Sequence, residues 1–284
     1  MKRQRKRYSR GERKVVLVND VNLNVKTTGS GPPVVALHGF AGDMSTWSEF
    51  IPEAQRKYTI ITIDTLGHGG SDAPDAPERY RMENTVNDIV AAIRKLGFSQ
   101  AAWIGYSMGG RVALAAAVLL PNACRTLVIE GGSPGLMSPS ARAQRRKHDK
   151  ALANFILKKG IEAFTDYWEQ QPMFNTQKSL PSNIRDRIRN QRLKSNPIGL
   201  ANTLRAAGTG AQPSFHEMLP SIKIPVLCIV GEYDRKFTTI ARKMCSKLQN
   251  GRLTVIPGAG HAAHLEKPSD FNRAVLTFLD GSSG

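Results

Sequence analysis

The feature that most limits how this 284-residue chain can fold is a serine between glycines, Gly105-Tyr106-Ser107-Met108-Gly109. A short apolar run, 101–104, precedes it, and an alanine-rich segment from Met108 to Leu120 follows it. This order predicts a strand, a sharp turn and a helix, because glycine lets the backbone pass closely at a strained turn. The hydroxyl of Ser107 would then stand at a helix N-terminus, where unpaired N–H groups favour developing negative charge. The motif therefore predicts a nucleophile elbow.

Apolar strand-like runs alternate with helical patterns around this motif. Two short strands, near 15–18 and 21–27, are separated by the turn-forming pair Asn19-Asp20 and form a hairpin. Strands that alternate with helices indicate a mostly parallel sheet with right-handed crossovers. We therefore predict an α/β fold in which one mostly parallel, eight-stranded sheet is flanked by helices. Its remaining strands are expected near 34–37, 58–63, 101–104, 126–129, 225–230 and 253–256.

The alternation stops between residues 134 and 213, where the chain is helix-prone and basic and contains Phe155, Phe164 and Trp168. We interpret this segment as a helical lid insertion over the strand ends. Residues 15–133 and 214–280 would then form the core, and 281–284 a flexible tail. Residues 1–14 are predicted to be a basic, flexible arm.

The net charge of +17 is distributed unevenly along the chain. Residues 1–14 contribute +7 and residues 134–213 contribute +9, so everything else sums to +1. A nucleic-acid-binding role is disfavoured, while a weak contact between the arm and an anionic surface stays open. The excess in the lid instead favours a substrate that carries carboxylates.

Two features, the lack of a signal-peptide-like segment and the number of cysteines, indicate the cellular compartment of the protein. No apolar signal-peptide core comes after residue 14, and the longest apolar run, Val112 to Leu120, is far shorter than the roughly 20 residues that span a bilayer. Cys124, Cys228 and Cys245 are odd in number and lack metal-ligand spacing. We therefore expect a cytoplasmic protein without a bound metal.

Serine is a weak nucleophile and base, so a histidine must take its proton and a carboxylate must orient that histidine. Asp234 follows the predicted strand 225–230, and His261 lies in the loop after the last strand. The order serine, aspartate, histidine is the one that a nucleophile elbow of this kind requires. Alternatives remain open from the sequence: His264 could replace His261, and Glu130 or Glu232 could replace Asp234.

Two backbone N–H groups are expected to form an oxyanion hole. They belong to Met108, which follows the serine, and to Phe40, in the loop His38-Gly39-Phe40 after a strand. We expect structural roles for His38 and, in the glycine-rich loop 64–72, for His68 and Asp72.

Arg111 lies four residues after Ser107, one helical turn further on. A cation near a helix N-terminus is disfavoured by roughly 0.3 to 1 kcal/mol, so an anionic substrate group would explain it. A surface arginine without a role is the alternative. A guanidinium can give a carboxylate two parallel hydrogen bonds.

At these residues the chain resembles the 2-succinyl-6-hydroxy-2,4-cyclohexadiene-1-carboxylate synthases of menaquinone (vitamin K2) biosynthesis, members of the α/β-hydrolase superfamily. The resemblance runs from about Val15 to Leu279, and the arm lies outside it. The stretches that carry it are 105–111, 130–136 (Glu-Gly-Gly-Ser-Pro-Gly-Leu), 199–205, 208–213 and 231–237. The resemblance implies an α/β-hydrolase fold and a lyase that removes pyruvate from 2-succinyl-5-enolpyruvyl-6-hydroxy-3-cyclohexene-1-carboxylate. The triad serine would act as a base, with no metal or organic cofactor.

The resemblance also implies substrate-binding side chains. Tyr106 and Arg111 match directly. Arg145 matches the lid arginine, with the nearby Arg142 and Arg146 as alternatives if the register is different, and Arg192 is favoured over Lys194 for the next arginine. Trp168 matches the lid tryptophan, with a core anchor as the alternative. A hydrolase acting on a carboxylate-bearing ester or a carbon–carbon bond is the main rival function, and a non-catalytic binding protein is the second.

Overall fold

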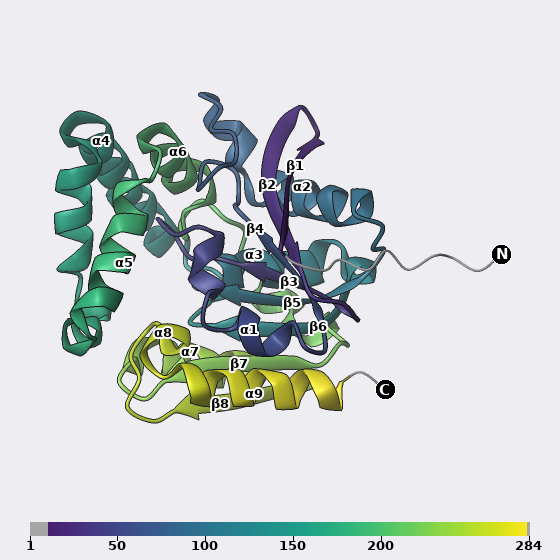
Figure 1. The fold of residues 1–284 in the computed structure, drawn as a ribbon. Helices are drawn as coiled ribbons and strands as arrows, with labels where there is room; N and C mark the ends of the chain where they lie inside the picture. Colours follow the sequence, from purple (N-terminus) through teal and green to yellow (C-terminus); the bar gives the residue numbers. More distant parts are fainter. Residues whose placement is uncertain (1–10, 283–284) are drawn as a thin grey trace.

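One sheet of eight strands organises the chain, and the computed structural model describes residues 11–282 of it (Figure 1). The strand order is β1-β2-β4-β3-β5-β6-β7-β8. The pairs β1/β2 and β2/β4 are antiparallel, and all the others are parallel. The strands are β1 Glu12–Val18, β2 Val21–Thr28, β3 Pro33–Leu37, β4 Thr59–Ile63, β5 Ala101–Tyr106, β6 Cys124–Glu130, β7 Val226–Gly231 and β8 Gly251–Ile256. The predicted mostly parallel, eight-stranded sheet is confirmed.

The edge strand β1 begins earlier than we predicted. It starts at Glu12, so residues 12–14, which we assigned to the basic arm, belong to the sheet. Their backbones pair with Thr27, Lys26 and Val25 of β2. Residues 1–10 of the predicted arm lie outside the described residues, as do residues 283 and 284 of the predicted tail. The last helix includes Gly281, so that residue is not part of a tail.

Helices cover both faces of the sheet because its central strands are apolar on both sides. On one face the helices α2 (Met82–Lys95), α3 (Met108–Leu119) and α7 (Arg235–Cys245) share an apolar core with strand residues such as Val35 and Trp103. On the other face α1 (Ile51–Ala54) and α9 (Pro268–Gly281) pack with Val34 and Ile60. The short helix α8 (Ala263–Glu266) precedes α9. Both arrangements can be followed in Figure 1.

The insertion after β6 forms a helical lid at one end of the sheet, on the left of Figure 1. It contains α4 (Pro139–Glu169), the 3-10 helix η4 (Pro172–Ser179), α5 (Ser182–Leu193) and α6 (Pro197–Ala207). An apolar cluster of its own joins α4 to α6 and reaches Ala41 in the loop after β3. The lid therefore rests on the carboxyl ends of the parallel strands, where binding sites of open α/β sheets lie.

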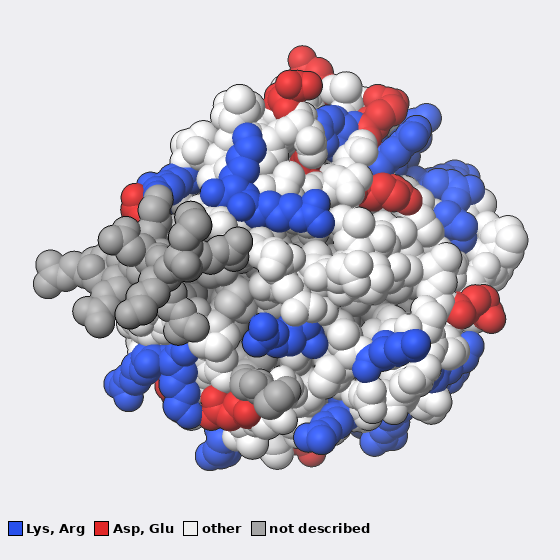
Figure 2. Space-filling model, turned by 90° about the vertical axis from the view of Figure 1, so that its right-hand side faces the viewer, with Lys and Arg blue, Asp and Glu red and all other residues white. Residues whose placement is uncertain are grey.

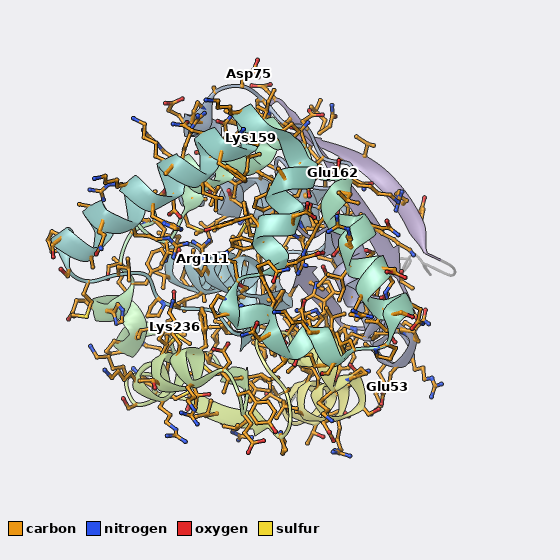
Figure 3. All side chains as sticks on the ribbon, turned by 90° about the vertical axis from the view of Figure 1, so that its left-hand side faces the viewer. Glu53, Asp75, Arg111, Lys159, Glu162 and Lys236 are labelled. Carbon is orange, nitrogen blue, oxygen red and sulfur yellow. The ribbon has the colours of Figure 1, made fainter. Side chains whose placement is uncertain are left out.

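Gly160 divides α4 into two helices that point in different directions. Its φ of 83° and ψ of 176° are not helical and belong to a region that only glycine adopts readily. Lys159 and Glu162, on either side of this break, are labelled at the top of the lid in Figure 3. The break allows the second half of α4 to turn back toward the core. Among residues 11–282, no helix is long and apolar enough to cross a membrane.

Candidate active site

Ser107 occupies a strained turn between β5 and α3. Its φ is 51° and its ψ is −104°, values that L-residues rarely adopt. Its backbone N–H donates to the Glu130 carbonyl oxygen at 2.7 Å, which ties the turn to β6. Glycine is required on both sides, because a Cβ at Gly105 would lie 2.2 Å from the Gly109 carbonyl oxygen and one at Gly109 would lie 2.3 Å from that of Leu37. The nucleophile elbow predicted from the sequence is therefore present.

The three predicted triad residues lie in line. Nε2 of His261 is 3.1 Å from Oγ of Ser107, and Nδ1 of His261 is 2.6 Å from Oδ2 of Asp234. A proton on Nδ1 donates to the carboxylate and leaves Nε2 as the acceptor of the serine proton. Asp234 is itself fixed, because its Oδ1 accepts the backbone N–H of Phe237 and caps α7. This arrangement can remove a proton from Ser107 and hold it on His261.

The three alternative residues have other partners. His264 Nδ1 is 2.8 Å from Oε2 of Glu130, and both side chains are buried behind Tyr106. Oε2 of Glu232 accepts the Gly258 backbone N–H at 2.8 Å. None of them contacts Ser107 Oγ or the ring nitrogens of His261, so geometry favours Asp234 and His261.

Glu266 supports the His261 loop, a role that we did not predict from the sequence. One carboxylate oxygen accepts the backbone N–H of Gly260 at 2.6 Å, and the other accepts that of Ala262 at 3.3 Å. The two bonds flank His261 and fix its backbone. A carboxylate soon after a glycine-rich histidine loop is the only sequence signal for this role.

The two predicted oxyanion donors remain available. No residue in the range 11–282 accepts a hydrogen bond from the backbone N–H of Phe40 or of Met108. Met108 is the first residue of α3, so its N–H has no partner within the helix. Two such groups beside Ser107 can stabilise an oxyanion.

Buried polar side chains hold the loop that carries Phe40. His38 contacts the Gly39 carbonyl oxygen through Nδ1 and accepts the Thr65 backbone N–H through Nε2. His68 packs its ring against Phe40, and burial followed by the neighbouring His38 lowers the pKa of His68 to about 3. His68 therefore supports the Phe40 loop with a neutral imidazole ring. Asp72 accepts the backbone N–H of Asn22 at 2.8 Å.

Arg111 joins the elbow to the base of the lid. Its Nη1 donates to the Ala207 carbonyl oxygen at 2.7 Å and to the side-chain oxygen of Gln212. Figure 3, which looks onto the lid, shows Arg111 between the two halves of α4. Burial, and then the nearby Arg145, lower the pKa of Arg111 to about 10, so it stays cationic at neutral pH. No bond from its Nε or Nη2 is found among residues 11–282, which leaves those donors for a ligand.

The three neighbouring arginines of α4 are distinguished by their partners. Arg142 and Arg146 donate to backbone carbonyl oxygens of the segment 210–212. Arg145 instead pairs through Nε with Asp149 at 2.8 Å and influences the charge of Arg111. Of the three, Arg145 is the one that acts electrostatically on Arg111, and neither of its terminal nitrogens has a hydrogen-bond partner among residues 11–282.

Arg192 is buried inside the lid, whereas Lys194 is exposed. Nη1 of Arg192 lies 3.2 Å from Oε1 of Glu169, and its Nη2 lies 3.3 Å from the side-chain oxygen of Gln177. The guanidinium group stacks on the ring of Phe174. Burial lowers the pKa of Arg192, and the Glu169 carboxylate acts in the opposite direction. The acidic partners of both lid arginines were not foreseen from the sequence.

Aromatic rings connect the lid to the triad. Trp168 packs against Phe40, at a ring-centre distance of 5.5 Å, and against Phe174, whose ring faces His261. Tyr106 lies between the rings of His261 and His264. Burial and then Glu130 raise the pKa of Tyr106 well above its ordinary value, so its hydroxyl keeps its proton. Trp168 thus anchors the lid and borders the site at the same time.

Positive charge is not confined to the lid. Figure 2 shows the side of the molecule away from the lid, where Lys and Arg side chains are interspersed with Asp and Glu. Surface charge alone therefore does not locate the site, which depends on the placement of individual arginines. No group of three or more His, Cys, Asp or Glu within residues 11–282 is arranged to hold a metal ion.

Comparison with known proteins agrees with this geometry. Residues 32–268 match the alpha/beta hydrolase fold family. The chain is 35% identical, over 84% of its length and 90% of the relative's, to the 2-succinyl-6-hydroxy-2,4-cyclohexadiene-1-carboxylate synthase of Salmonella paratyphi C (strain RKS4594). A Bacillus subtilis (strain 168) protein that carries the same synthase name provisionally is 43% identical, over 87% of this chain and 89% of its own.

One solved structure is similar to this chain over nearly the whole length of both proteins. The structure of MenH from S. aureus superposes with a TM-score of 0.88 at 34% identity, covering 92% of this chain and 99% of that one. The matched region includes the lid as well as the sheet. This chain is therefore an enzyme of the α/β-hydrolase fold and belongs to the 2-succinyl-6-hydroxy-2,4-cyclohexadiene-1-carboxylate synthase family.

Proposed function

We propose that this enzyme eliminates pyruvate from 2-succinyl-5-enolpyruvyl-6-hydroxy-3-cyclohexene-1-carboxylate and forms 2-succinyl-6-hydroxy-2,4-cyclohexadiene-1-carboxylate for menaquinone biosynthesis. One observation carries the proposal. A complete serine, histidine and aspartate triad lies one helical turn from the half-buried Arg111, under a lid with further arginines, in a chain of this family. An ordinary ester site does not need this concentration of cations.

The proton path follows from the geometry of the triad. His261 takes the proton of Ser107 through Nε2, while Asp234 stabilises the resulting imidazolium. The Ser107 oxygen then removes a ring proton from the substrate. The electron pair forms a double bond between ring carbons 2 and 3, the existing 3,4 double bond shifts to 4,5, and the bond between ring carbon 5 and the enolpyruvyl oxygen breaks. Pyruvate leaves as its enolate and takes up the proton held on His261, which restores the triad, so water is not a reactant.

The cationic side chains would bind the carboxylates of the substrate. Arg111 has donors left over from its bonds to Ala207 and Gln212, and Arg145 and Arg192, each paired with one acidic side chain, add guanidinium groups from the lid. Tyr106 can donate its hydroxyl proton, and Trp168 would cover the ring. The backbone N–H groups of Phe40 and Met108 would stabilise negative charge that develops during elimination. Such orientation and charge stabilisation are typically worth several kcal/mol.

The setting of the reaction follows from the same proposal. Its partner is a small polycarboxylate, and neither a metal ion nor an organic cofactor takes part. Work in the cytoplasm fits the three free thiols, Cys124, Cys228 and Cys245. The basic residues before Glu12 would at most add a weak contact with an anionic surface, and the site has no need of nucleic acid.

Pyruvate release tests the proposal directly. The purified enzyme should convert the pathway intermediate to equimolar pyruvate and diene, while a panel of simple esters should be turned over much more slowly. Pyruvate can be followed with a coupled dehydrogenase, and the diene by its ultraviolet absorbance. Rapid ester turnover without pyruvate release would contradict the proposal.

The same triad and oxyanion hole could serve a hydrolase acting on a carboxylate-bearing ester or a carbon–carbon bond. Acylation of Ser107 distinguishes such a hydrolase from the proposed lyase. Hydrolysis by this machinery passes through an acyl-serine, whereas elimination does not. Mass spectrometry of enzyme quenched during turnover should show unmodified Ser107. An acylated Ser107 would favour the hydrolase.

A further inference from the structure

Asp149 is an acidic residue in the basic lid that the proposed reaction does not use. It lies on α4, its side chain is 2% exposed, and its Oδ1 accepts a hydrogen bond from Nε of Arg145 at 2.8 Å. Its Oδ2 is buried and has no hydrogen-bond partner among residues 11–282. Burying a carboxylate oxygen in this way is costly, so the position calls for an explanation.

Stability of the helix does not provide that explanation. In an exposed helix an acid four residues before a base is the better orientation, and here the arginine comes first. The pair joins a buried carboxylate to an arginine whose side chain is 38% exposed, and pairs of this kind add little to folding. An apolar residue at position 149 would pack in the same place without burying a charge.

The carboxylate lies at the junction between the lid and Arg111. A Cβ at Gly208 would be 2.4 Å from Oδ2 of Asp149, so the carboxylate lies directly against that backbone. The preceding residue, Ala207, supplies the carbonyl oxygen that accepts from Arg111. Asp149 therefore brings negative charge to this junction, where Arg145 and Asp149 both act electrostatically on Arg111.

The bond to Asp149 uses only one edge of the Arg145 guanidinium. It engages Nε, and no bond from either terminal nitrogen is found within residues 11–282. The two terminal nitrogens are a pair that can bind a carboxylate in a bidentate manner. A guanidinium fixed at Nε presents this pair in one direction and loses less side-chain entropy when a ligand binds.

We propose that Asp149 is a positioning residue: it holds Arg145 by Nε, so that its terminal nitrogens and Arg111 together form a preorganised carboxylate site. This inference rests on the proposed function, in which Arg145 contacts substrate. Asp149 itself touches no reacting atom. Its effect reaches the ligand only through Arg145, and that dependence can be measured.

The test measures how tightly a carboxylate probe binds, separately from catalysis. Citrate is titrated by calorimetry into wild type, Asp149→Ala, Asp149→Asn, Arg145→Ala and the double variant with Ala at both positions. Pyruvate release from the pathway intermediate is measured in parallel. Asp166→Asn is the matched control, because Asp166 is also a lid aspartate paired with an arginine, Arg189, but its side chain is 62% exposed.

We expect Asp149→Ala to weaken citrate binding and raise KM by about tenfold, with kcat changed less than threefold, as loss of one charge-assisted hydrogen bond predicts. Asp149→Asn keeps an acceptor for Nε and should lose less than threefold. In the Arg145→Ala background, removal of Asp149 should have no further effect. Asp166→Asn should match wild type.

Several results would overturn the inference. The first is equal citrate affinity in wild type and Asp149→Ala, which includes the case in which neither binds citrate measurably. The second is an equal loss of citrate affinity in Asp149→Ala and Asp149→Asn. The third is a double variant whose loss of affinity is the sum of the two single losses. Thermal unfolding of each variant identifies a misfolded protein, in which case the Asn variant decides. If citrate binding depends on Asp149 but no pyruvate is released, the carboxylate site stands and the proposed reaction is wrong.

Discussion

The two halves of the site are built in different ways. On the core side, Ser107, His261 and Asp234 extend from the ends of strands, and bonds to the backbone hold the surrounding turns. On the lid side, Arg145 and Arg192 are held by the side chains of Asp149 and Glu169. The sheet therefore fixes the geometry of the triad, whereas the proposed binding of carboxylates would depend on ion pairs within an insertion. Changes in the core should affect kcat, and changes in the lid should mainly affect KM.

The largest effect is expected from Ser107→Ala. Loss of the base should lower kcat by about 100- to 10,000-fold, the usual contribution of a positioned acid–base group. Pyruvate release measures the rate, and calorimetry should show that ligand binding persists, because the lid is untouched. A rate equal to wild type would exclude Ser107 as the base.

Arg111→Gln should sharpen the comparison, because Arg111 connects the two halves. We expect KM to rise by about 10- to 100-fold, since a charge-assisted contact of roughly 1.5–3 kcal/mol is lost. Arg205→Gln is the matched control, because this lid arginine bonds to Asn154 and Asn202 instead. Equal kinetic constants for both variants would remove the proposed role of Arg111.

Most of the core half could be predicted from the sequence, because its signals are local. The alternation of strands and helices indicated the sheet, and the loops after two strands located Asp234 and His261. The start of β1 could not be predicted, since Glu12 and Lys14 are polar and their place in the sheet depends on backbone pairing with β2. Apolar alternation is absent there.

The lid half was predicted less completely for a physical reason. Arg145 and Arg192 belong to a recognisable pattern, but an acid such as Asp149 within a basic helix looks like an ordinary solvated charge. Only tertiary packing reveals that its carboxylate is buried against Gly208. Gln212, which binds Arg111, is likewise uninformative without the fold.

A smaller effect is expected from backbone strain at one glycine in each half. Gly160, in the lid, and Gly97, after the core helix α2, both have positive φ, and a Cβ at either would meet nothing within 4 Å. Alanine at each should therefore cost about 1–3 kcal/mol of unfolding free energy through backbone strain alone. We expect Gly160→Ala, but not Gly97→Ala, to raise KM as well, because the second half of α4 carries Trp168. Denaturant melts and steady-state kinetics measure both quantities, and equal KM values would show that the break in α4 does not shape the site.

The last effect concerns stability in acid and not turnover, and it should originate on the core side. His68 packs on Phe40, and its pKa falls from 6.5 to about 3 on folding, with burial as the main cause. Between these values the unfolded chain binds a proton that the folded chain does not, so the unfolding free energy must decrease as pH falls from 6.5 toward 3. The slope from one such group is at most about 1.4 kcal/mol per pH unit. His68→Asn, which cannot titrate there, should flatten this dependence in denaturant melts, whereas His148→Asn, at an exposed lid position, should leave it unchanged. The same slope in wild type and His68→Asn would mean that acid destabilises the protein through groups other than His68.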